Sequence, residues 1–285
     1  MKIGIDSYCY HRYFGEDSAD QNNPAGRMDT GSFLRRAIEL GVDGVSLETC
    51  YFESLDESYL KRLKEIIDRG NLEPVVAWGH PRGLEGGRNP AALEDLKVHF
   101  RTCRILGAGI MRVVGSSHAY RHEPHGPQIE KLARMFREPV GMAEDQGIRL
   151  ALENHLDFTA DEVFEILEGV SSDSFGMTFD TGNALRIGDD PVSAARKCAQ
   201  RIFATHIKDV APLYGGDPRD WCFFASVPVG RGIIDIPKVV RTLKGAGYDG
   251  LFAIELDCLH PDYKEEDPSV AESVTYLRKL RDSSA

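Results

Sequence analysis

The stretch Leu150-Ala151-Leu152-Glu153-Asn154-His155 is a short apolar run that ends in a carboxylate and an imidazole. Short apolar runs of this length are typical of buried strands. Three later stretches share the design: Gly176-Met177-Thr178-Phe179-Asp180, Phe203-Ala204-Thr205-His206 and Phe252-Ala253-Ile254-Glu255. Four predicted strands therefore each end on a side chain that can bind a metal ion.

On both sides of these stretches, runs of strand length alternate with amphipathic segments of helix length. The predicted strands lie near residues 2–8, 44–49, 74–79, 110–115, 149–154, 175–180, 202–207 and 251–256. The predicted helices lie near residues 30–40, 56–69, 90–106, 128–146, 160–170, 191–199, 236–246 and 265–282. This alternation predicts an α/β fold, a single (β/α)₈ TIM barrel over residues 1–285.

An open, doubly wound sheet is the alternative arrangement of eight parallel strands. It would usually begin with a glycine-rich phosphate loop after the first strand. Here that position reads Asp6-Ser7-Tyr8-Cys9-Tyr10-His11, which contains no glycine. The sequence therefore favours the closed barrel.

Composition narrows the classes of partner. The 285 residues carry a net charge of −11, and an acidic surface repels phosphate backbones and anionic lipid. No apolar run reaches the roughly 20 residues that span a bilayer, and the first residues lack a signal-peptide pattern. The six cysteines are scattered without a CxxC pair. We expect a cytoplasmic protein with reduced thiols that binds neither nucleic acid nor membrane.

Strand parity predicts which side chains face the barrel interior, because alternate residues of a strand point inward. With Glu153 inward, the same parity places Asp180, His206 and Glu255 inward, and Phe203 outward against the helices. All four inward groups lie at the C-terminal ends of their strands, where barrel enzymes carry out chemistry. Strands five to eight are neighbours around a barrel, so these groups are expected to converge.

Three carboxylates in one cavity repel each other unless a cation compensates them. The sequence therefore predicts one divalent metal ion bound by Glu153, Asp180, His206 and Glu255. Oxygen donors with one imidazole suit Mn²⁺ first, with Mg²⁺, Co²⁺ or Zn²⁺ as options.

Four motifs carry a family resemblance: Leu152-Glu153-Asn154-His155, Phe179-Asp180-Thr181-Gly182-Asn183, His206-Ile207-Lys208-Asp209 and Ile254-Glu255. They resemble the xylose-isomerase-like barrel superfamily, and most of all its branch of sugar epimerases and isomerases related to D-tagatose and D-psicose 3-epimerase. The stretch Val229-Gly230-Arg231-Gly232-Ile233-Ile234-Asp235 also resembles that branch. The resemblance runs from the first strand to about residue 257 and is most specific in the second half.

The resemblance implies an isomerase or epimerase that acts on a ketose or keto-sugar derivative, a small carbohydrate. It implies that Glu153 and Glu255 are the acid/base pair, with a metal that stabilises an enediolate. Barrels of this class commonly form dimers, so a homo-oligomer is a further expectation. The chain departs from the family at Asn183, where a histidine is common; asparagine can hydrogen-bond a substrate oxygen but carries no proton.

Further candidates lie near the same strand ends. His155 is either a third acid/base group or a hydrogen-bond partner of the centre. The remaining candidates for substrate binding are His80, Trp78, Glu48, Asn183, Lys208 and Arg231, with Arg219 as an alternative arginine. His118, His122 and His125 form a histidine-rich loop whose irregular spacing favours solvent over a second metal. Long connections at 7–29 and 208–235 are candidates for lids, and the second carries Trp221, Phe223 and Phe224.

Three other functions remain open. A metal-dependent lyase or dehydratase acting on a keto-sugar, inosose or C-glycoside would use the same site and would expel a leaving group instead of returning the proton. A DNA-repair endonuclease of the endonuclease IV type needs additional histidines, including one at position 183, and fits poorly with Asn183 and a charge of −11. A barrel kept as an accessory or binding subunit is the non-enzymatic reading, which the intact set of four ligands opposes.

Overall fold

The computed structural model describes residues 1–16 and 26–283, and within them eight parallel strands close into a barrel. The strands follow the order β1-β10-β7-β6-β5-β4-β3-β2 around the barrel. Their bounds are β1 Lys2–Asp6, β2 Gly44–Glu48, β3 Glu73–Ala77, β4 Ile110–Val113, β5 Arg149–Glu153, β6 Phe175–Asp180, β7 Ile202–Ile207 and β10 Leu251–Ile254. The predicted TIM barrel is confirmed.

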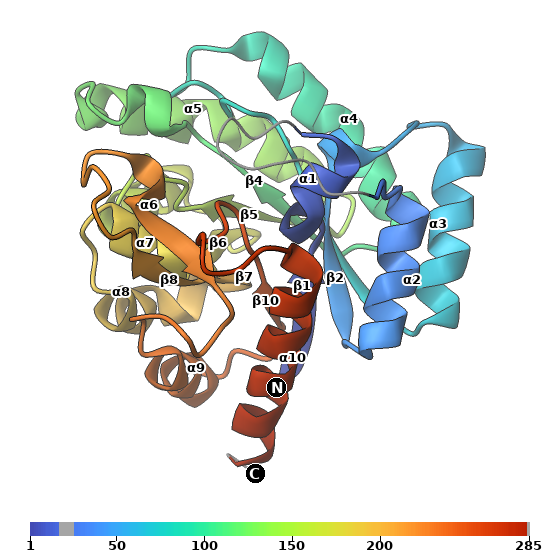
Figure 1. Ribbon diagram of the computed structural model, residues 1–285. Helices are drawn as coiled ribbons and strands as arrows, with labels where there is room; N and C mark the ends of the chain where they lie inside the picture. The colour runs from blue at the N-terminus through green and yellow to red at the C-terminus, as the bar shows by residue number, and fades with distance from the viewer. Residues whose placement is uncertain (17–25, 284–285) are drawn as a thin grey trace.

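Helices surround the strands as an outer ring (Figure 1). Their bounds are α1 His11–Phe14, α2 Thr30–Leu40, α3 Glu57–Arg69, α4 Pro90–Leu106, α5 His125–Glu144, α6 Ala160–Val170, α7 Thr181–Arg186, α8 Pro191–Cys198, α9 Ile236–Gly245 and α10 Glu266–Asp282. Short 3₁₀ turns lie at Ser7–Tyr10, Thr49–Tyr51, His118–Tyr120, Ala199–Arg201 and Trp221–Phe223. The eight predicted helices are present, while the short α1 and α7 were not foreseen.

Six helices begin with the same local hydrogen bond. A polar side chain at the N-cap accepts the backbone N–H three residues later, which satisfies one of the free donors of the first turn. These caps are Asp29, Asn89, Thr159, Asp180, Asp190 and Asp235. None of the helices in the described ranges is long and apolar enough to cross a membrane.

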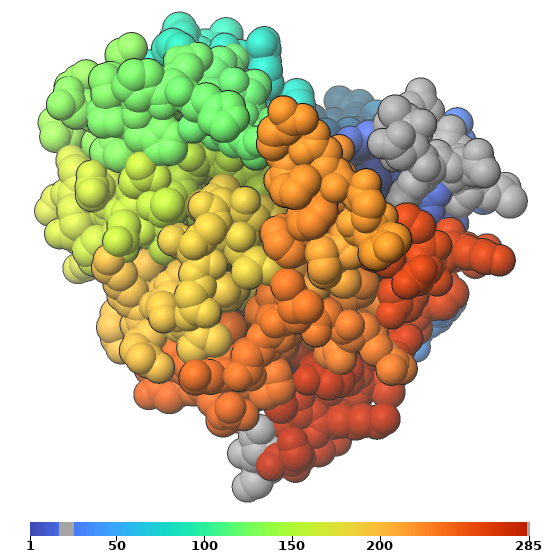
Figure 2. Space-filling model, turned by 60° about the vertical axis from the view of Figure 1, so that its left-hand side comes forward, coloured from blue at the N-terminus to red at the C-terminus, as the bar shows by residue number. Residues whose placement is uncertain are grey.

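The connection at 208–235 contains an unpredicted antiparallel hairpin, β8 Asp209–Pro212 and β9 Phe224–Val227. On one side, main-chain bonds tie it to the segment after β10: the Ser226 N–H donates to the Cys258 carbonyl at 2.7 Å, and the His260 N–H donates to the Ser226 carbonyl at 2.8 Å. On the other side, the Arg121 guanidinium donates to the Arg219 carbonyl at 3.2 Å. Figure 2 shows this part of the chain, in orange, lying against the green surface that includes α5.

The other long connection, 7–29, was also a candidate lid. Its described part forms a 3₁₀ turn and α1, and residues 17–25 lie outside the described residues.

The floor of the barrel interior is apolar. Its buried cluster consists of Val75, Ile110, Ala151, Ala204 and Leu251, with the half-buried Phe203 packed against it. The prediction that Phe203 faces the helices is wrong. The pairing of β6 with β7 moves from Met177↔Ile202 to Thr178↔Ala204, so Phe203 is the extra residue of a bulge, and this irregularity frees its ring from strict alternation.

Gly176 accommodates that ring. A Cβ atom at this position would lie 2.5 Å from the Phe203 ring and 2.5 Å from the Arg201 carbonyl oxygen. Glycine at 176 therefore fits the close approach of the bulged strand.

Candidate metal centre

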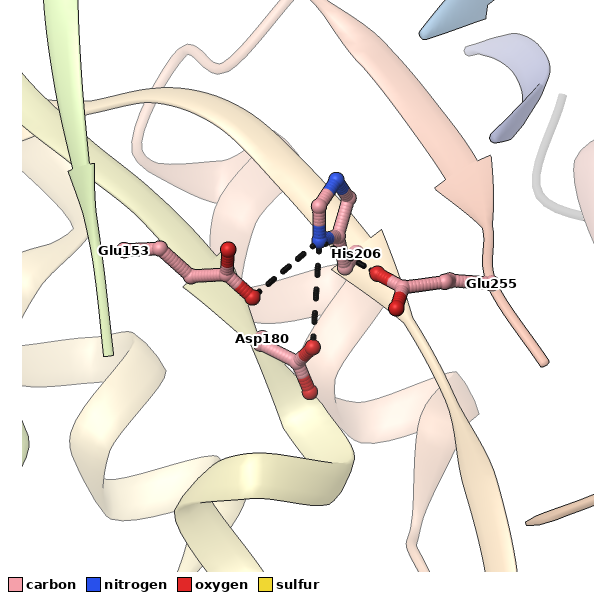
Figure 3. A group of neighbouring side chains, drawn as sticks. All are labelled: Glu153, Asp180, His206 and Glu255. Carbon is pink, nitrogen blue, oxygen red and sulfur yellow. Dashed lines mark hydrogen bonds and ion pairs between the residues drawn. The ribbon is translucent and has the colours of Figure 1, made fainter. Parts of the chain in front are cut away.

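The predicted metal-binding side chains converge at the C-terminal ends of four neighbouring strands. Glu153 and Asp180 are the last residues of β5 and β6, His206 is next to last in β7, and Glu255 follows β10 directly. Asp180 pairs in register with His206. The ligand atoms lie within 4.8 Å of one another, and all four residues are buried. Figure 3 shows their polar ends pointing to one centre.

His206 occupies the middle of the group. Its Nδ1 lies 2.5 Å from Glu255 Oε2, 3.2 Å from Glu153 Oε1 and 3.8 Å from Asp180 Oδ2 (Figure 3). Its Nε2 lies 3.4 Å from Asp6 Oδ2 on the other side of the ring. The side chain therefore directs Nδ1 toward the three carboxylates, and Asp6 is placed to hold the ring through Nε2, as carboxylates do behind metal-bound histidines.

The charges of the group are strongly coupled. Burial alone would lower the pKa of His206, but Glu255 and Glu153 hold it well above its ordinary value. Burial alone would raise the pKa of Glu255, but His206 and Lys208 lower it to about 2. Burial raises the pKa of Asp180 to about 7, despite the nearby Lys208 cation. The pocket thus strongly favours a positive charge at its centre.

Arg112 is a buried cation that was not predicted from the sequence. Its guanidinium forms an ion pair with Glu153 Oε2 and lies 3.2 Å from Glu48 Oε1. Burial alone would raise the pKa of Glu153, but Arg112 and His206 hold it well below its ordinary value. Because Arg112 engages Oε2, Glu153 directs Oε1 toward the common centre. An arginine within the apolar run Ile110-Met111-Arg112-Val113 was the available signal.

Lys208, a weak candidate in the sequence, lies among the carboxylates of the site. Its Nζ is 2.9 Å from Asp180 Oδ2, 3.0 Å from Glu255 Oε1 and 3.0 Å from Asp257 Oδ2. Asp257 in turn forms a buried ion pair with Arg186 at 2.5 Å. Asp257 and Arg186 were not foreseen, because they lie in a loop and a short helix where strand parity gives no direction.

The donor set fits a divalent metal ion. Asp180 Oδ2 and Glu255 Oε2 are buried atoms that accept no hydrogen bond from the described residues, although cationic nitrogens lie nearby. A buried carboxylate oxygen in this state is costly unless a cation compensates it. Three carboxylates and one imidazole are ligands typical of Mn²⁺, Mg²⁺, Co²⁺ or Zn²⁺ sites.

Two other expected residues lie close to this centre. Asn183 Nδ2 donates to Glu153 Oε1 at 3.2 Å, and Lys208 donates to Asn183 Oδ1 at 3.4 Å. His155 is half-buried, and burial lowers its pKa to about 4. Its Nδ1 is buried and has no hydrogen-bond partner among the described residues.

The remaining candidates lie in different surroundings. Trp78 is buried and its indole N–H donates to Asp95 of α4 at 2.8 Å, so the ring faces the helices and not the metal centre. His80 stacks on Trp78 with ring centroids 5.1 Å apart. Arg231 is exposed and forms an ion pair with Glu272 of α10 at 2.6 Å, and Arg219 is exposed and pairs with Asp217. The structure thus places Trp78 and Arg231 away from the centre, because other partners hold both side chains.

The histidine-rich loop brings no second metal centre. His125 lies in α5 and its Nδ1 is 2.7 Å from Glu162, while His122 accepts a hydrogen bond from Arg121. Within residues 1–16 and 26–283, the group of Glu153, Asp180, His206 and Glu255 is the one potential metal site of at least three such ligands.

Comparison with known proteins places this geometry in context. A family model described as "Xylose isomerase-like TIM barrel" matches residues 34–280. The rhizopine catabolism protein MocC of Rhizobium meliloti is 28% identical over 273 residues, which cover 84% of this chain and 81% of MocC. An inosose dehydratase of Clostridium beijerinckii is 24% identical over 242 residues, which cover 77% of this chain and 78% of that protein.

Solved structures share the fold. A D-tagatose 3-epimerase-like protein superimposes with a TM-score of 0.74 at 21% identity and covers 100% of both chains. The IOLI protein with a bound zinc atom superimposes with a TM-score of 0.72 at 20% identity and covers 98% of both chains.

Proposed function

Because the chain belongs to the xylose isomerase-like TIM barrel family, we propose that it is a divalent-metal-dependent enzyme that removes a proton next to the carbonyl of a ketose or keto-sugar derivative. The reaction that the site supports best is epimerisation or isomerisation. The metal ligands are Glu153, Asp180, His206 and Glu255. Mn²⁺ is our first choice, and the zinc bound to the IOLI protein makes Zn²⁺ the closest rival.

The observation that carries this proposal is the opposition of two glutamates. Glu153 and Glu255 approach the His206 Nδ1 from opposite sides, at 3.2 Å and 2.5 Å (Figure 3). A substrate carbon held between them has one carboxylate on each face. One glutamate then removes the proton and the other returns a proton from the far face, which inverts the centre.

The bound ion would polarise the carbonyl and neutralise the charge that develops on oxygen as the proton leaves. Arg112 keeps Glu153 ionised and fixes its orientation. The Lys208 ammonium, within 3.0 Å of both Asp180 and Glu255, balances the charge of the two carboxylates and holds them in place. Asn183 positions an oxygen by hydrogen bonding and transfers no proton.

A lyase or dehydratase is the second candidate. The two glutamates have different cationic partners, because Arg112 forms an ion pair with Glu153 whereas Lys208 lies 3.0 Å from Glu255. A dehydratase needs one base and a means of expelling a hydroxyl group, which suits two carboxylates in different surroundings. The inosose dehydratase relative supports the same candidate.

Exchange of the substrate proton with solvent distinguishes the two reactions. The Mn²⁺-loaded protein is incubated in D₂O with a panel of ketoses and inososes, and the products are followed by NMR and mass spectrometry. Deuterium at an inverted carbon supports the epimerase, whereas loss of water to give an unsaturated ketone assigns the dehydratase. If no substrate exchanges and the purified protein binds none of the candidate metals, the enzymatic proposal falls and an accessory role takes its place.

A further inference from the structure

A cavity of about 300 Å³ lies beside the metal centre at the same end of the barrel. Its walls come from the start of α5 and the residues before it, from the turn after β5 and the start of α6, from α7 and the residue after it, and from the segment that joins β8 to β9. The residues that matter here are Leu156, Arg186, Ile187, Pro218, Trp221 and Phe224. A volume near 300 Å³ is at the lower end of pockets that bind small molecules.

Two short contacts link the cavity wall to the metal centre. Arg186, in the cavity wall, lies 3.5 Å from Asn183 Oδ1 through Nη1, and Asn183 Nδ2 lies 3.2 Å from Glu153 Oε1. Leu156, on the opposite wall, follows Glu153 by three residues with a φ of 55°. A bulky residue seldom adopts this left-handed conformation, and strained turns of this kind cluster at functional sites.

The charged groups of the wall are already paired with protein atoms. Arg186 forms its ion pair with Asp257 and donates to the Phe224 carbonyl at 2.8 Å. Asp157 accepts backbone N–H groups from Ser116, His155 and Phe158. Other charged residues of the wall also have protein partners: His125 lies 2.7 Å from Glu162, Arg121 donates to the Arg219 carbonyl at 3.2 Å, and Asp220 accepts the Cys222 N–H at 3.0 Å. Because protein atoms engage these groups, the cavity has little means of selecting an ion.

The apolar part of the wall consists of five residues. Trp221 is the largest surface, and the Arg186 guanidinium carbon lies 5.4 Å from its ring centroid, a contact that fixes the indole. Pro218 and Phe224 come from the same segment, while Leu156 and Ile187 face them from the barrel side. Such walls bind rings by stacking and burial.

We propose that this cavity is a second subsite, which receives a flat, uncharged ring that the substrate carries beyond the sugar unit at the metal centre. The proposal rests on the proposed function and narrows its substrate class to ring-bearing sugar conjugates. The ring is either an aromatic group or a second sugar, since both present flat C–H or π faces to an indole.

The test uses the two tryptophans of the chain. Trp78 is buried with 1% of its surface exposed, so the W78F variant leaves Trp221 as the fluorescence reporter of the cavity. The full chain is titrated in EDTA with phenyl β-D-glucoside, with cellobiose, and with methyl β-D-glucoside. The methyl glucoside has the sugar unit but lacks the second ring. We expect at least one ring-bearing ligand to bind about tenfold more tightly than the methyl glucoside and to change the Trp221 emission. Whichever of phenyl β-D-glucoside and cellobiose binds more tightly shows whether the subsite takes an aromatic ring or a second sugar.

Matched variants locate the binding in the cavity. Calorimetry compares Trp221→Ala with Phe223→Ala, a neighbouring aromatic residue that does not line the cavity. We expect the first to abolish the preference for the ring and the second to preserve it. Ile187→Phe fills the cavity from the opposite wall and is expected to lower the same preference, which covers the case in which Trp221→Ala fails to fold.

Equal affinity for the ring-bearing and methyl ligands would overturn the subsite, as would equal losses in the Trp221 and Phe223 variants. Because the binding is measured without metal, its result does not depend on whether the protein is a metal-dependent enzyme. A protein that binds the phenyl ligand but exchanges no substrate proton retains the subsite and loses the enzymatic proposal. A protein that turns over free ketoses without preference for a ring does the reverse.

Discussion

The mouth of the barrel interior is formed by the metal-binding group Glu153, Asp180, His206 and Glu255. It is built on the same strands as the floor, two residues further along, and the two regions have opposite chemistry. Ala151 lies one inward position below Glu153, Ala204 one below His206, and Ala253 one below Glu255. The floor buries small or aliphatic side chains, whereas the mouth buries carboxylates with atoms that accept no hydrogen bond from the described chain. The difference teaches that the floor stabilises the fold and that the mouth is stable only through compensating cations.

Removing the proton carrier at the mouth should have the largest effect. We expect Glu255→Gln to lower kcat by about 10²–10⁴-fold, because the amide keeps the shape of the side chain but can neither take up nor release a proton at neutral pH. Steady-state kinetics with the substrate found in the D₂O screen measure it. The control at the floor is Ala151→Gly, which should cost stability but little kcat. A Glu255→Gln enzyme of normal kcat would contradict the assignment.

Removing the cation beneath Glu153 should have the next largest effect. Arg112→Met leaves a buried carboxylate without its partner, which typically costs about 3–5 kcal/mol. Urea unfolding of the metal-free protein measures the loss. Arg112→Lys keeps the charge but not the planar fork, so its loss should be smaller. If the methionine variant is as stable as the parent protein, Arg112 does not compensate the charge of the buried Glu153 carboxylate.

Metal binding should stabilise the mouth directly. At a metal concentration 100 times its Kd, the folded state gains about 2.7 kcal/mol. Differential scanning calorimetry with and without Mn²⁺ measures the rise in Tm. The Asp180→Asn variant is the control, because it should bind the ion poorly and show a much smaller rise. An unchanged Tm in the parent protein would contradict the proposed metal centre.

A change at the floor should cost less and should leave the metal site intact. Gly176→Ala forces a Cβ atom against the Phe203 ring and the Arg201 carbonyl, and overpacking of this kind costs about 1–3 kcal/mol. Gly141→Ala in α5 is the matched control, because a Cβ atom there would meet nothing within 4 Å beyond its chain neighbours and its own helix backbone. Chemical unfolding compares the two variants. Equal stabilities would show that the bulge yields without cost.

The smallest expected effect is the pH dependence of metal affinity. The raised pKa of His206 means that the metal-free site holds a proton above the ordinary histidine value of 6.5, and metal binding must displace this proton. Affinity should therefore rise about tenfold per pH unit between 6.5 and the raised pKa. Calorimetry in buffers of different ionisation enthalpy counts the protons released. Binding without proton release would show that His206 is neutral before the metal arrives.

Much of the fold and the four ligands could be predicted from the sequence, because apolar runs mark strands and parity marks their inward faces. Glu153, Asp180 and His206 followed from that rule alone. Phe203 defied it, since a bulge is set by tertiary packing and leaves no mark in the hydrophobic pattern. The inward parity of β3 at Ala77, which pairs with Glu48, would have placed Trp78 outside the barrel.

The hairpin and the cations around the carboxylates were harder to foresee. β8 and β9 are four residues each and are stabilised by contacts with distant loops. Arg112 was visible as a charge in an apolar run, but its partner depends on a neighbouring strand. Asp257 and Arg186 meet across 71 positions of sequence, a pairing that no local pattern encodes.

The unequal attachment of the hairpin has a mechanical consequence. On the side of β10, main-chain bonds at Ser226 join it to the segment that follows Glu255, whereas on the side of α5 a side-chain bond joins Arg121 to the exposed Arg219. Main-chain bonds in a ladder resist shear together, but a single arginine contact yields alone. The edge beside β10 is therefore expected to keep its contacts when the Arg121 edge is released, and slower amide hydrogen exchange at Ser226 and His260 than near Arg219 would show it.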